Sequence, residues 1–460
     1  MRRFSIILYS LVCAVLLVSC GADQAIKKGD KFYAVGEYYD AAEQYRKAYT
    51  QTPSKERKLR GERARKLAEC YRRINLTNKA IAAYNNVVRY KQADSLTYLY
   101  LGQLHMKNGN YKEAEKQFQT AIDSLRFSAY GSKVDSALQL AENGLKSARM
   151  ANQWRKEGSA YTVKRMDIFN SRRDDYSPML GGEENNQLYF TSTRNQAQGD
   201  EYSGITGAKA ADIFMSQKDD KGKWGKPQSI DSELNSSYDE GACCFSPDGK
   251  TMYLTQCKTD ANYPRYATIA VSYRTDAAWG KPKELVIAND TLYSYAHPAV
   301  SPDGEWLYFV SDMPGGMGGL DIWRCRLLSH GEPGAVENLG EPVNTAGDEM
   351  FPTFRPNGDL YFSSNGHPGL GGLDIFIAKG KSLIHLGAPM NSQGDDFGMT
   401  FEGTRNQGFF CSNRGDSRGN DHIYSFYNPE IIQTVKGWVY EQDGYELTAA
   451  QVYMAGNDGT

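Results

Sequence analysis

Ser417 has the setting that comes closest to that of a catalytic nucleophile. It lies at the centre of Gly415-Asp-Ser-Arg-Gly419, which has the Gly-x-Ser-x-Gly spacing of the sharp turn that exposes the serine of many hydrolases. That turn must join a strand to a helix and be followed by an acid and a histidine. Here it lies in a loop between two expected strands, and His422 comes three residues after its end. We therefore expect no catalytic serine at this position.

The other reactive side chains lack the spacing that metal or redox chemistry requires. Six histidines are scattered without ligand spacing and no Cys-x-x-Cys pair is present, so we expect no His-based metal site, no redox centre and no cofactor. The acidic loop Gly394-Asp-Asp396 has two interpretations, a calcium site or a capped turn, and we favour the turn. Most of the cysteines beyond the N-terminus should be small buried hydrophobes: Cys70, Cys243, Cys244, Cys257, Cys325 and Cys411.

Cys20 is a different kind of nucleophile, because it follows a secretory signal. Arg2 and Arg3 form a positive start, and residues 4–18 are almost wholly apolar but too few for a comfortable transmembrane span. The signal ends in Leu17-Val-Ser-Cys-Gly21, which resembles the lipobox of bacterial lipoproteins. The resemblance implies a signal peptide at residues 1–19, lipid attachment at Cys20 and, from the glycine that follows, sorting to the outer membrane. The alternative is an ordinary signal peptide with a chance cysteine.

Residues 20–155 carry a helical repeat. A trio of small and aromatic residues recurs at steps of 39 and 34 residues: Ala41, Tyr45 and Ala48; Ala80, Tyr84 and Val87; Ala114, Phe118 and Ala121. We attribute the longer first step to a longer loop over residues 54–61, and we expect a further helix over residues 133–154. The pattern resembles the tetratricopeptide repeat, most clearly over residues 95–128. That resemblance implies pairs of antiparallel helices that stack into a short superhelix.

The concave face of such a superhelix can bind a peptide or a helix of a partner protein. Side chains on or near the first helix of each pair are candidates to line it, namely Tyr33, Tyr71, Arg72, Tyr98 and His105. Some of these must instead pack between helices. The alternative function is a structural spacer that holds the next domain away from the membrane.

Residues 161–430 carry a second repeat, made of short strands. Its core is a Pro-Asp-Gly or Pro-Asn-Gly turn followed by an aromatic strand, clearest at residues 245–254, 300–309 and 354–362. Five copies of four strands predict a five-bladed β-propeller, which resembles the WD40-like (PD40) propellers of TolB type. The last copy lacks its fourth strand, and the missing tail precedes the first copy at Met166–Asn170. We therefore expect the N-terminal strand to pair into the last blade and close the ring.

Residues 431–460 begin a third module. A strand, an Asp443-Gly444 turn and a second strand resemble the opening of a carboxypeptidase-regulatory-like β-sandwich, which two strands alone cannot complete. The expected fold class is therefore multidomain α and β, with an α-helical tetratricopeptide superhelix, a five-bladed propeller and the start of a sandwich.

The charge of the chain is divided between the two repeats. The net charge of -2 argues against a dedicated nucleic-acid binder. Residues 21–160 hold 26 Lys and Arg against 15 Asp and Glu, whereas residues 161–460 hold 25 against 40. The two interpretations are solvated surfaces of different origin, or a basic face that meets an acidic partner or an anionic envelope surface.

The order of these parts is more specific than any one of them. A lipobox, helical repeats, a Pro-Asp propeller and a regulatory-like sandwich resemble the PorE-like lipoproteins of the type IX secretion (Por) system of Bacteroidetes. This resemblance implies a non-enzymatic scaffold, anchored in the outer membrane through Cys20 and facing the periplasm, that binds protein subunits of a secretion complex. It also implies peptidoglycan binding through an OmpA-like domain that this sequence does not contain. The alternatives are a propeller hydrolase (peptidase or glycosidase) and a TolB-like or glycan-binding surface lipoprotein.

Overall fold

The chain divides into two compact units, residues 1–428 and residues 429–460. The computed structural model describes residues 21–127, 131–199, 202–230, 233–257, 266–275, 278–288, 292–429, 437–440 and 442–445. The predicted signal at residues 1–19, Cys20 and most of the predicted sandwich at residues 431–460 lie outside the described residues. In the described ranges, no helix combines the length and apolar character needed to cross a membrane.

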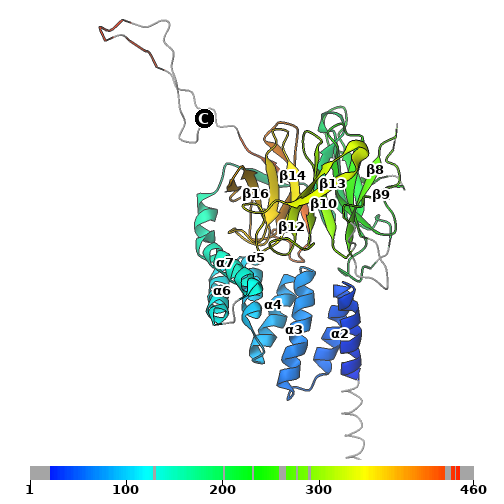
Figure 1. Cartoon of the computed structure of the whole chain (residues 1–460), viewed down its shortest axis with the longest axis vertical. Coiled ribbons are helices and arrows are strands. Elements are labelled where there is room, and N and C mark those ends of the chain that lie inside the picture. The colour runs from blue at the N-terminus through cyan, green and yellow to red at the C-terminus, as the bar shows by residue number, and fades with distance from the viewer. Residues whose placement is uncertain are drawn as a thin grey trace, which may run out of the picture. The chain divides into compact units, whose positions relative to one another are not determined.

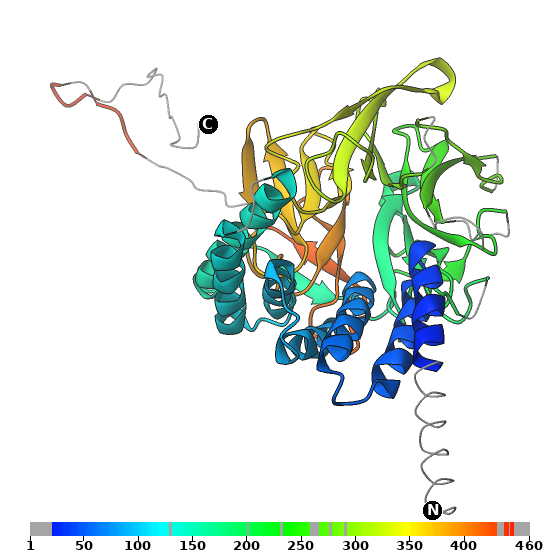
Figure 2. The ribbon, with the colours of Figure 1, turned by 60° about the horizontal axis from the view of Figure 1, so that its bottom comes forward.

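Seven helices make up the first part of the described chain (Figures 1 and 2). Residues 21–34 are helical. They are followed by α2 (Tyr38–Gln51), α3 (Arg57–Arg73), α4 (Thr77–Arg89), α5 (Ser95–Lys107), α6 (Tyr111–Arg126) and α7 (Ser132–Glu157). The predicted helical repeat is confirmed, and α7 includes the further helix expected over residues 133–154.

The longer first step of the repeat comes from a longer helix. Residues 52–56 and 90–94 form loops of equal length before α3 and α5, but α3 has 17 residues and α5 has 13. The predicted long loop over residues 54–61 is therefore wrong. The segment from Arg57 onward is rich in Lys, Arg, Leu and Glu, which favour the helix.

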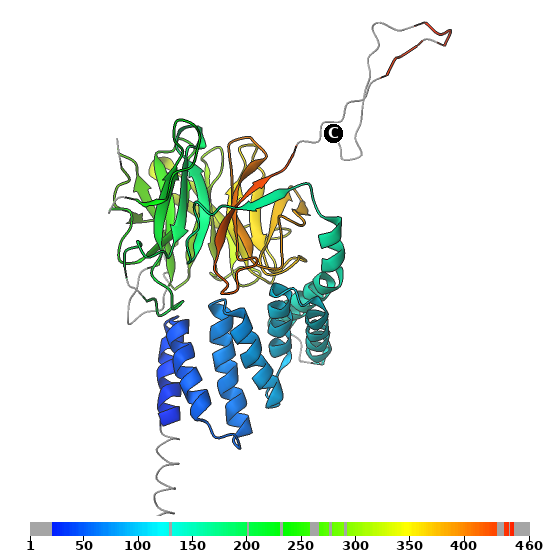
Figure 3. The same ribbon diagram turned by 180° about the vertical axis from the view of Figure 1, so that it is seen from behind.

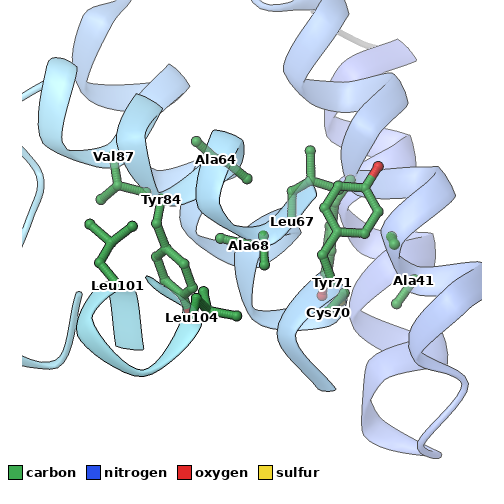
Figure 4. Packing of buried hydrophobic residues seen from close by; sticks show 14 residues of the cluster. Ala41, Ala64, Leu67, Ala68, Cys70, Tyr71, Tyr84, Val87, Leu101 and Leu104 are labelled. Carbon is green, nitrogen blue, oxygen red and sulfur yellow. The ribbon is translucent and has the colours of Figure 1, made fainter. Parts of the chain in front are cut away.

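Small residues let the helices of each pair approach closely. A Cβ added at Gly29 would lie 2.6 Å from the Tyr45 ring, and one at Gly102 would lie 2.6 Å from the Phe118 ring. Any larger side chain would therefore force the helices apart. Figure 4 shows the same packing around α3, where Ala64, Leu67 and Ala68 lie among side chains of the neighbouring helices.

Five four-stranded antiparallel sheets follow the helices and form the predicted five-bladed β-propeller (Figures 1 and 3). Blade 1 holds β2 (Asp175–Gly181), β3 (Gln187–Ser192), β4 (Asp212–Gln217) and β5 (Gln228–Ser229). Blade 2 holds β6 (Asp239–Phe245), β7 (Thr251–Cys257), β8 (Ala267–Tyr273) and β9 (Lys283–Glu284). Blade 3 holds β10 (Tyr295–Val300), β11 (Trp306–Ser311), β12 (Asp321–Leu327) and β13 (Pro333–Asn338). Blade 4 holds β14 (Glu349–Phe354), β15 (Leu360–Ser364), β16 (Asp374–Lys379) and β17 (Ser382–His385).

The fifth blade confirms the predicted ring closure. It holds β18 (Asp396–Phe401), β19 (Gln407–Ser412) and β20 (His422–Tyr427), and its fourth strand is the N-terminal β1 (Thr162–Arg165). In Figure 3 the teal β1 runs beside the orange-red β20. The paired strand lies just before the predicted segment Met166–Asn170, which continues from β1 as a turn. Because β1 pairs with β20, the last blade has four strands like the others, and the strand from the N-terminal side of the propeller holds the ring closed.

In four of the five blades, an asparagine at the end of the repeated tail is hydrogen-bonded to the third strand. The Asn170 side chain accepts a hydrogen bond from the Ile423 N–H at 2.7 Å and donates one to the Ile423 carbonyl at 2.8 Å. The same two bonds join three further pairs: Asn235 with Ile213, Asn344 with Ile322 and Asn391 with Ile375. The asparagines of the repeated sequence are therefore structural.

Hydrogen bonds join the helices to loops of blades 1, 4 and 5. The Tyr39 N–H of α2 donates to the Gly204 carbonyl of blade 1 at 3.0 Å. The Asn143 amide of α7 donates to the Gly366 carbonyl of blade 4 at 2.9 Å. The Lys107 ammonium of α5 lies 2.8 Å from the Asp395 carboxylate beside blade 5. The basic helices and the acidic propeller thus meet within residues 1–428.

Candidate functional site

A groove of about 510 Å³ opens along the first helices of the three helix pairs. Leu96, at the start of α5, is 40% exposed there, so an apolar side chain stands among charged ones. Tyr45 and Tyr84 are almost fully buried and form the base. The other lining residues come from the segment 21–34, from α3 and from α5 with its cap: Asp30, Tyr33, Arg65, Lys66, Glu69, Asp94, Thr97 and Tyr100.

The charges at one side of the groove are already paired. Asp30 accepts hydrogen bonds from the Lys66 ammonium at 2.6 Å and from the Tyr45 hydroxyl at 2.7 Å. Burial alone would raise the pKa of Asp30, but the bonds from Lys66 and Tyr45 outweigh it and hold that pKa below its ordinary value. Asp30 therefore stays ionised and fixed in place.

Glu69 holds the middle of the groove. It accepts bonds from the Arg72 guanidinium at 2.6 Å and from the Tyr84 hydroxyl at 2.9 Å. Burial would raise the pKa of Glu69, but the hydrogen bond and charge of Arg72 lower it below its ordinary value. The Arg72 guanidinium also lies 4.1 Å from the centre of the Tyr100 ring. The groove thus presents fixed charges beside rigid aromatic rings, which suits binding and not proton transfer.

The residues predicted to line the groove are placed in different surroundings. Tyr33 lines it. Tyr71 is 8% exposed and packs in the hydrophobic core between helices (Figure 4). Arg72 turns toward Glu69 and Tyr100, and Tyr98 packs against the cluster formed by α5, α6 and α7. His105 is half-buried, its Nδ1 has no hydrogen-bond partner, and burial lowers its pKa. The structure therefore brings only Tyr33, of these five, to the groove lining.

Most of the residues that line the groove were not predicted from the sequence, although their spacing along each helix could have indicated them. Neighbouring lining residues on each first helix lie three or four positions apart, as in Asp30 with Tyr33, Lys66 with Glu69, and Leu96 with Tyr100. Residues at this spacing share one face of a helix. Aligning the three first helices on this spacing would have found the exposed face.

The centre of the propeller is nearly closed. Each of the five innermost strands has an irregularity at a residue with positive φ, namely Ser177, Ala242, His297, Phe351 and Gly398. Among them only about 30 Å³ is left open, and no carboxylate belongs to the described lining of this space. The His297 ring stacks on the Phe351 ring, with 3.8 Å between the ring centres. Burial lowers the pKa of His297 to about 3. This centre has little room for a substrate, and its histidine is neutral.

Several of the remaining reactive side chains make structural contacts. Gly415–Gly419 lies between β19 and β20, as expected, and the His422 Nε2 lies 3.0 Å from the Asp416 carboxylate. In the loop considered for calcium, Asp395 pairs with Lys107 and Asp396 pairs with Arg414. No group of three potential metal ligands occurs in the part of the chain that the structure describes. Most of the six cysteines beyond the N-terminus were predicted to be buried, and five of them are: Cys70, Cys243, Cys244, Cys325 and Cys411.

Residues 95–124 match the tetratricopeptide repeat family model. The match covers α5, whose Leu96, Thr97 and Tyr100 line the groove, and most of α6. Both helices pack against α7. A search of curated proteins finds no significant match to this chain.

The solved structures similar to this chain include proteins named as hydrolases. An α-L-arabinofuranosidase of Lactobacillus brevis is 12% identical with a TM-score of 0.35, and the alignment covers 63% of this chain and 97% of that one. An endo-arabinase of Bacteroides thetaiotaomicron is 16% identical with a TM-score of 0.35, covering 58% and 97%. A puromycin-hydrolyzing peptidase of Mycobacterium tuberculosis is 16% identical with a TM-score of 0.30, covering 54% of this chain and 44% of its own.

Proposed function

We propose that this chain is a non-enzymatic scaffold that binds a segment of a partner protein in the tetratricopeptide groove. The observation that carries this proposal is the contrast between two openings in the same unit. The helical groove has about 510 Å³ of space among paired charges and aromatic rings, whereas the propeller centre has about 30 Å³. Tetratricopeptide repeats generally bind proteins through such a concave face.

The nature of the groove suits a peptide or a helix with both apolar and charged side chains. Tyr33, Leu96 and Tyr100 offer apolar contact, and the ion pairs of Lys66 with Asp30 and of Arg65 with Asp94 flank them. Because these charges are already held by one another, little side-chain entropy would be lost when a partner binds.

The proposed setting of this scaffold is the bacterial envelope. A lipid at Cys20 would hold the chain to the outer membrane with the groove and propeller in the periplasm. The order of lipobox, helical repeats, propeller and sandwich supports a role like that of PorE in type IX secretion. On this proposal the partners are subunits of the secretion complex, and an OmpA-like domain beyond this sequence would bind peptidoglycan.

A hydrolase is the main alternative, and the centre of the propeller bears on it. A propeller enzyme would need reactive side chains that converge there with space for a substrate. The described lining instead includes Met179, Cys243, Pro298 and the His297–Phe351 stack. The buried Cys243 thiol has its pKa raised to about 12 by desolvation, so it is no ready nucleophile.

A matched pair of leucine variants tests the groove. Leu96→Glu places a charge among the groove's apolar contacts, and an acidic residue in the first turn of α5 should be tolerated by the helix. Leu328→Glu, at a 50% exposed leucine of blade 3, is the control. Leu96→Glu should retain at least tenfold less of the envelope proteins that co-purify with the lipidated full chain, a loss of about 1.4 kcal/mol in binding free energy. Leu328→Glu should retain as much of them as the unmodified chain does. Equal retention by both variants would overturn the groove assignment.

A further inference from the structure

Two loops on the same side of the propeller have nearly the same sequence and the same internal structure. We name Gly315–Asp321 the blade 3 loop and Pro368–Asp374 the blade 4 loop. In the blade 3 loop, Asp321 accepts from the N–H groups of Met317 at 2.5 Å and of Gly318 at 3.2 Å. In the blade 4 loop, Asp374 accepts from the N–H groups of Leu370 at 2.8 Å and of Gly371 at 3.1 Å. Met317 and Leu370 therefore occupy equivalent positions at the tips of equivalent loops.

A second aspartate from the next blade braces each loop in the same way. Asp348 accepts from the Leu320 N–H at 3.0 Å and from the Asn365 side chain at 2.9 Å. Asp395 accepts from the Leu373 N–H at 3.1 Å and from the Asn413 side chain at 2.9 Å. Each site thus combines an apolar tip with a carboxylate held by two hydrogen bonds.

The blade 4 site binds a helical hairpin of this chain. Leu370 is fully buried in the hydrophobic cluster of α5, α6 and α7. The Tyr111 hydroxyl, at the start of α6, donates to the Leu370 carbonyl at 2.9 Å. Lys107, at the end of α5, lies 2.8 Å from the Asp395 carboxylate. The turn between α5 and α6 therefore supplies a cation and a hydroxyl donor, and α5, α6 and α7 together enclose the apolar tip.

The blade 3 site presents the same groups without such a cover in the described part of the chain. Residues 315–319 are all exposed, and Met317 is 37% exposed. The corresponding residues of the blade 4 loop are mostly buried. Asp348 keeps its bonds to Leu320 and Asn365, and no described helix supplies it with a cation as Lys107 does for Asp395.

We propose that the blade 3 site binds a helical hairpin of another protein. The hairpin would cover Met317 with its apolar side chains and place a lysine or arginine of its turn against Asp348. The chemistry is fixed by the occupied copy, since the two sites share their tip, their carboxylate and their backbone geometry. A second copy of this chain is a poorer occupant, because its Lys107 and Tyr111 are already bound to its own blade 4 site. The inference extends the proposed scaffold role and rests on it, but it concerns a surface separate from the groove.

Site-specific photo-cross-linking tests the proposal in the native envelope. A benzophenone amino acid replaces Met317 in the full lipidated chain, and the same amino acid at Leu328 is the control. Both residues flank β12 but lie at its opposite ends, and both are exposed. We expect the probe at position 317 to cross-link to a helix–turn–helix segment with a basic residue in its turn. Asp348→Lys should lower the yield at least tenfold, and Asp348→Asn, which keeps an acceptor for the Leu320 N–H, should lower it less.

Several results would overturn the proposal. The first is a cross-linking yield at position 317 no higher than at position 328. The second is cross-linking to lipid, glycan, a second copy of this chain or a non-helical segment. The third is a yield at position 317 that Asp348→Lys leaves unchanged. The Leu96→Glu variant separates this claim from the groove. If cross-linking at position 317 persists in Leu96→Glu, the groove and the blade 3 site are independent surfaces. Loss of the cross-link in that variant would contradict their independence.

Discussion

The blade 3 and blade 4 loops show how one structural motif meets two different surroundings. Within each loop the aspartate, the glycines and the hydrogen bonds match, yet Leu370 is fully buried and Met317 is 37% exposed. The difference lies in what packs against the loop, because α5, α6 and α7 cover only the blade 4 copy among the described contacts. The lesson is that burial of a loop residue is decided by its partner, and three predictions test how much that partner contributes.

Lys107→Met should have the largest effect on stability. Asp395 has only 8% of its side chain exposed, so removing Lys107 leaves a buried carboxylate without its cation. Breaking a buried ion pair from one side costs about 3–5 kcal/mol. Urea denaturation of the full chain measures this loss. The double variant Lys107→Met/Asp395→Asn should recover most of it, and a double variant no more stable than the single one would contradict the role given to the pair.

Leu370→Ala should cost somewhat less, about 2–5 kcal/mol, because it removes a fully buried side chain and leaves a cavity. Met317→Ala is the matched variant at the equivalent position. It should change the free energy of unfolding by no more than about 0.5 kcal/mol, since Met317 is exposed. Equal effects of the two substitutions in the same denaturation experiment would show that the helices do not distinguish the loops.

The pH dependence of the blade 4 contact should be the smallest effect. Burial would raise the pKa of Asp395, but Lys107 lowers it below its ordinary value of 3.8. The ionised carboxylate therefore contributes stability above that value, and the contribution is lost as the pH falls through the lowered pKa. Each unit by which folding lowers the pKa adds about 1.4 kcal/mol to the free energy of unfolding at a pH where the carboxylate is ionised.

The comparison of wild type with Asp395→Asn isolates this contribution. Other buried carboxyls act in the opposite sense, because burial raises the pKa of Asp374 and Asp421. Unfolding midpoints measured between about pH 3 and 6 should fall more steeply toward acid in the wild type. If the unfolding midpoints of the two proteins fall in parallel as the pH is lowered, Asp395 is not the source of the pH dependence.

Much of the fold could be predicted from sequence because its signals are local. The Pro-Asp-Gly turns and aromatic strands mark each blade, and the tail that ends in Asn170 marks the closing strand. These residues act on their immediate neighbours, so short segments carry the information. The length of α3 was misjudged because charged residues are common in both loops and exposed helices.

The groove lining could not be chosen in the same way. Successive helical residues turn by about 100°, so Tyr98 and Tyr100 face different neighbours although both are tyrosines of α5. Tyr100 lines the groove, whereas Tyr98 packs toward α6 and α7. The helical phase of each first helix depends on packing between helices. Likewise, nothing in the sequence of the two glycine-rich loops indicates which one a helical hairpin covers.

Hydrogen–deuterium exchange would show whether this chain holds partner proteins at the groove and at the blade 3 loop. The lipidated full chain would be compared alone and within its native envelope assembly. We expect slower exchange in the assembly at the start of α5 around Leu96 and in the blade 3 loop, with no change around His297. Unchanged exchange at both surfaces, together with new protection of residues 295–299 and 349–353 at the propeller centre, would contradict that expectation.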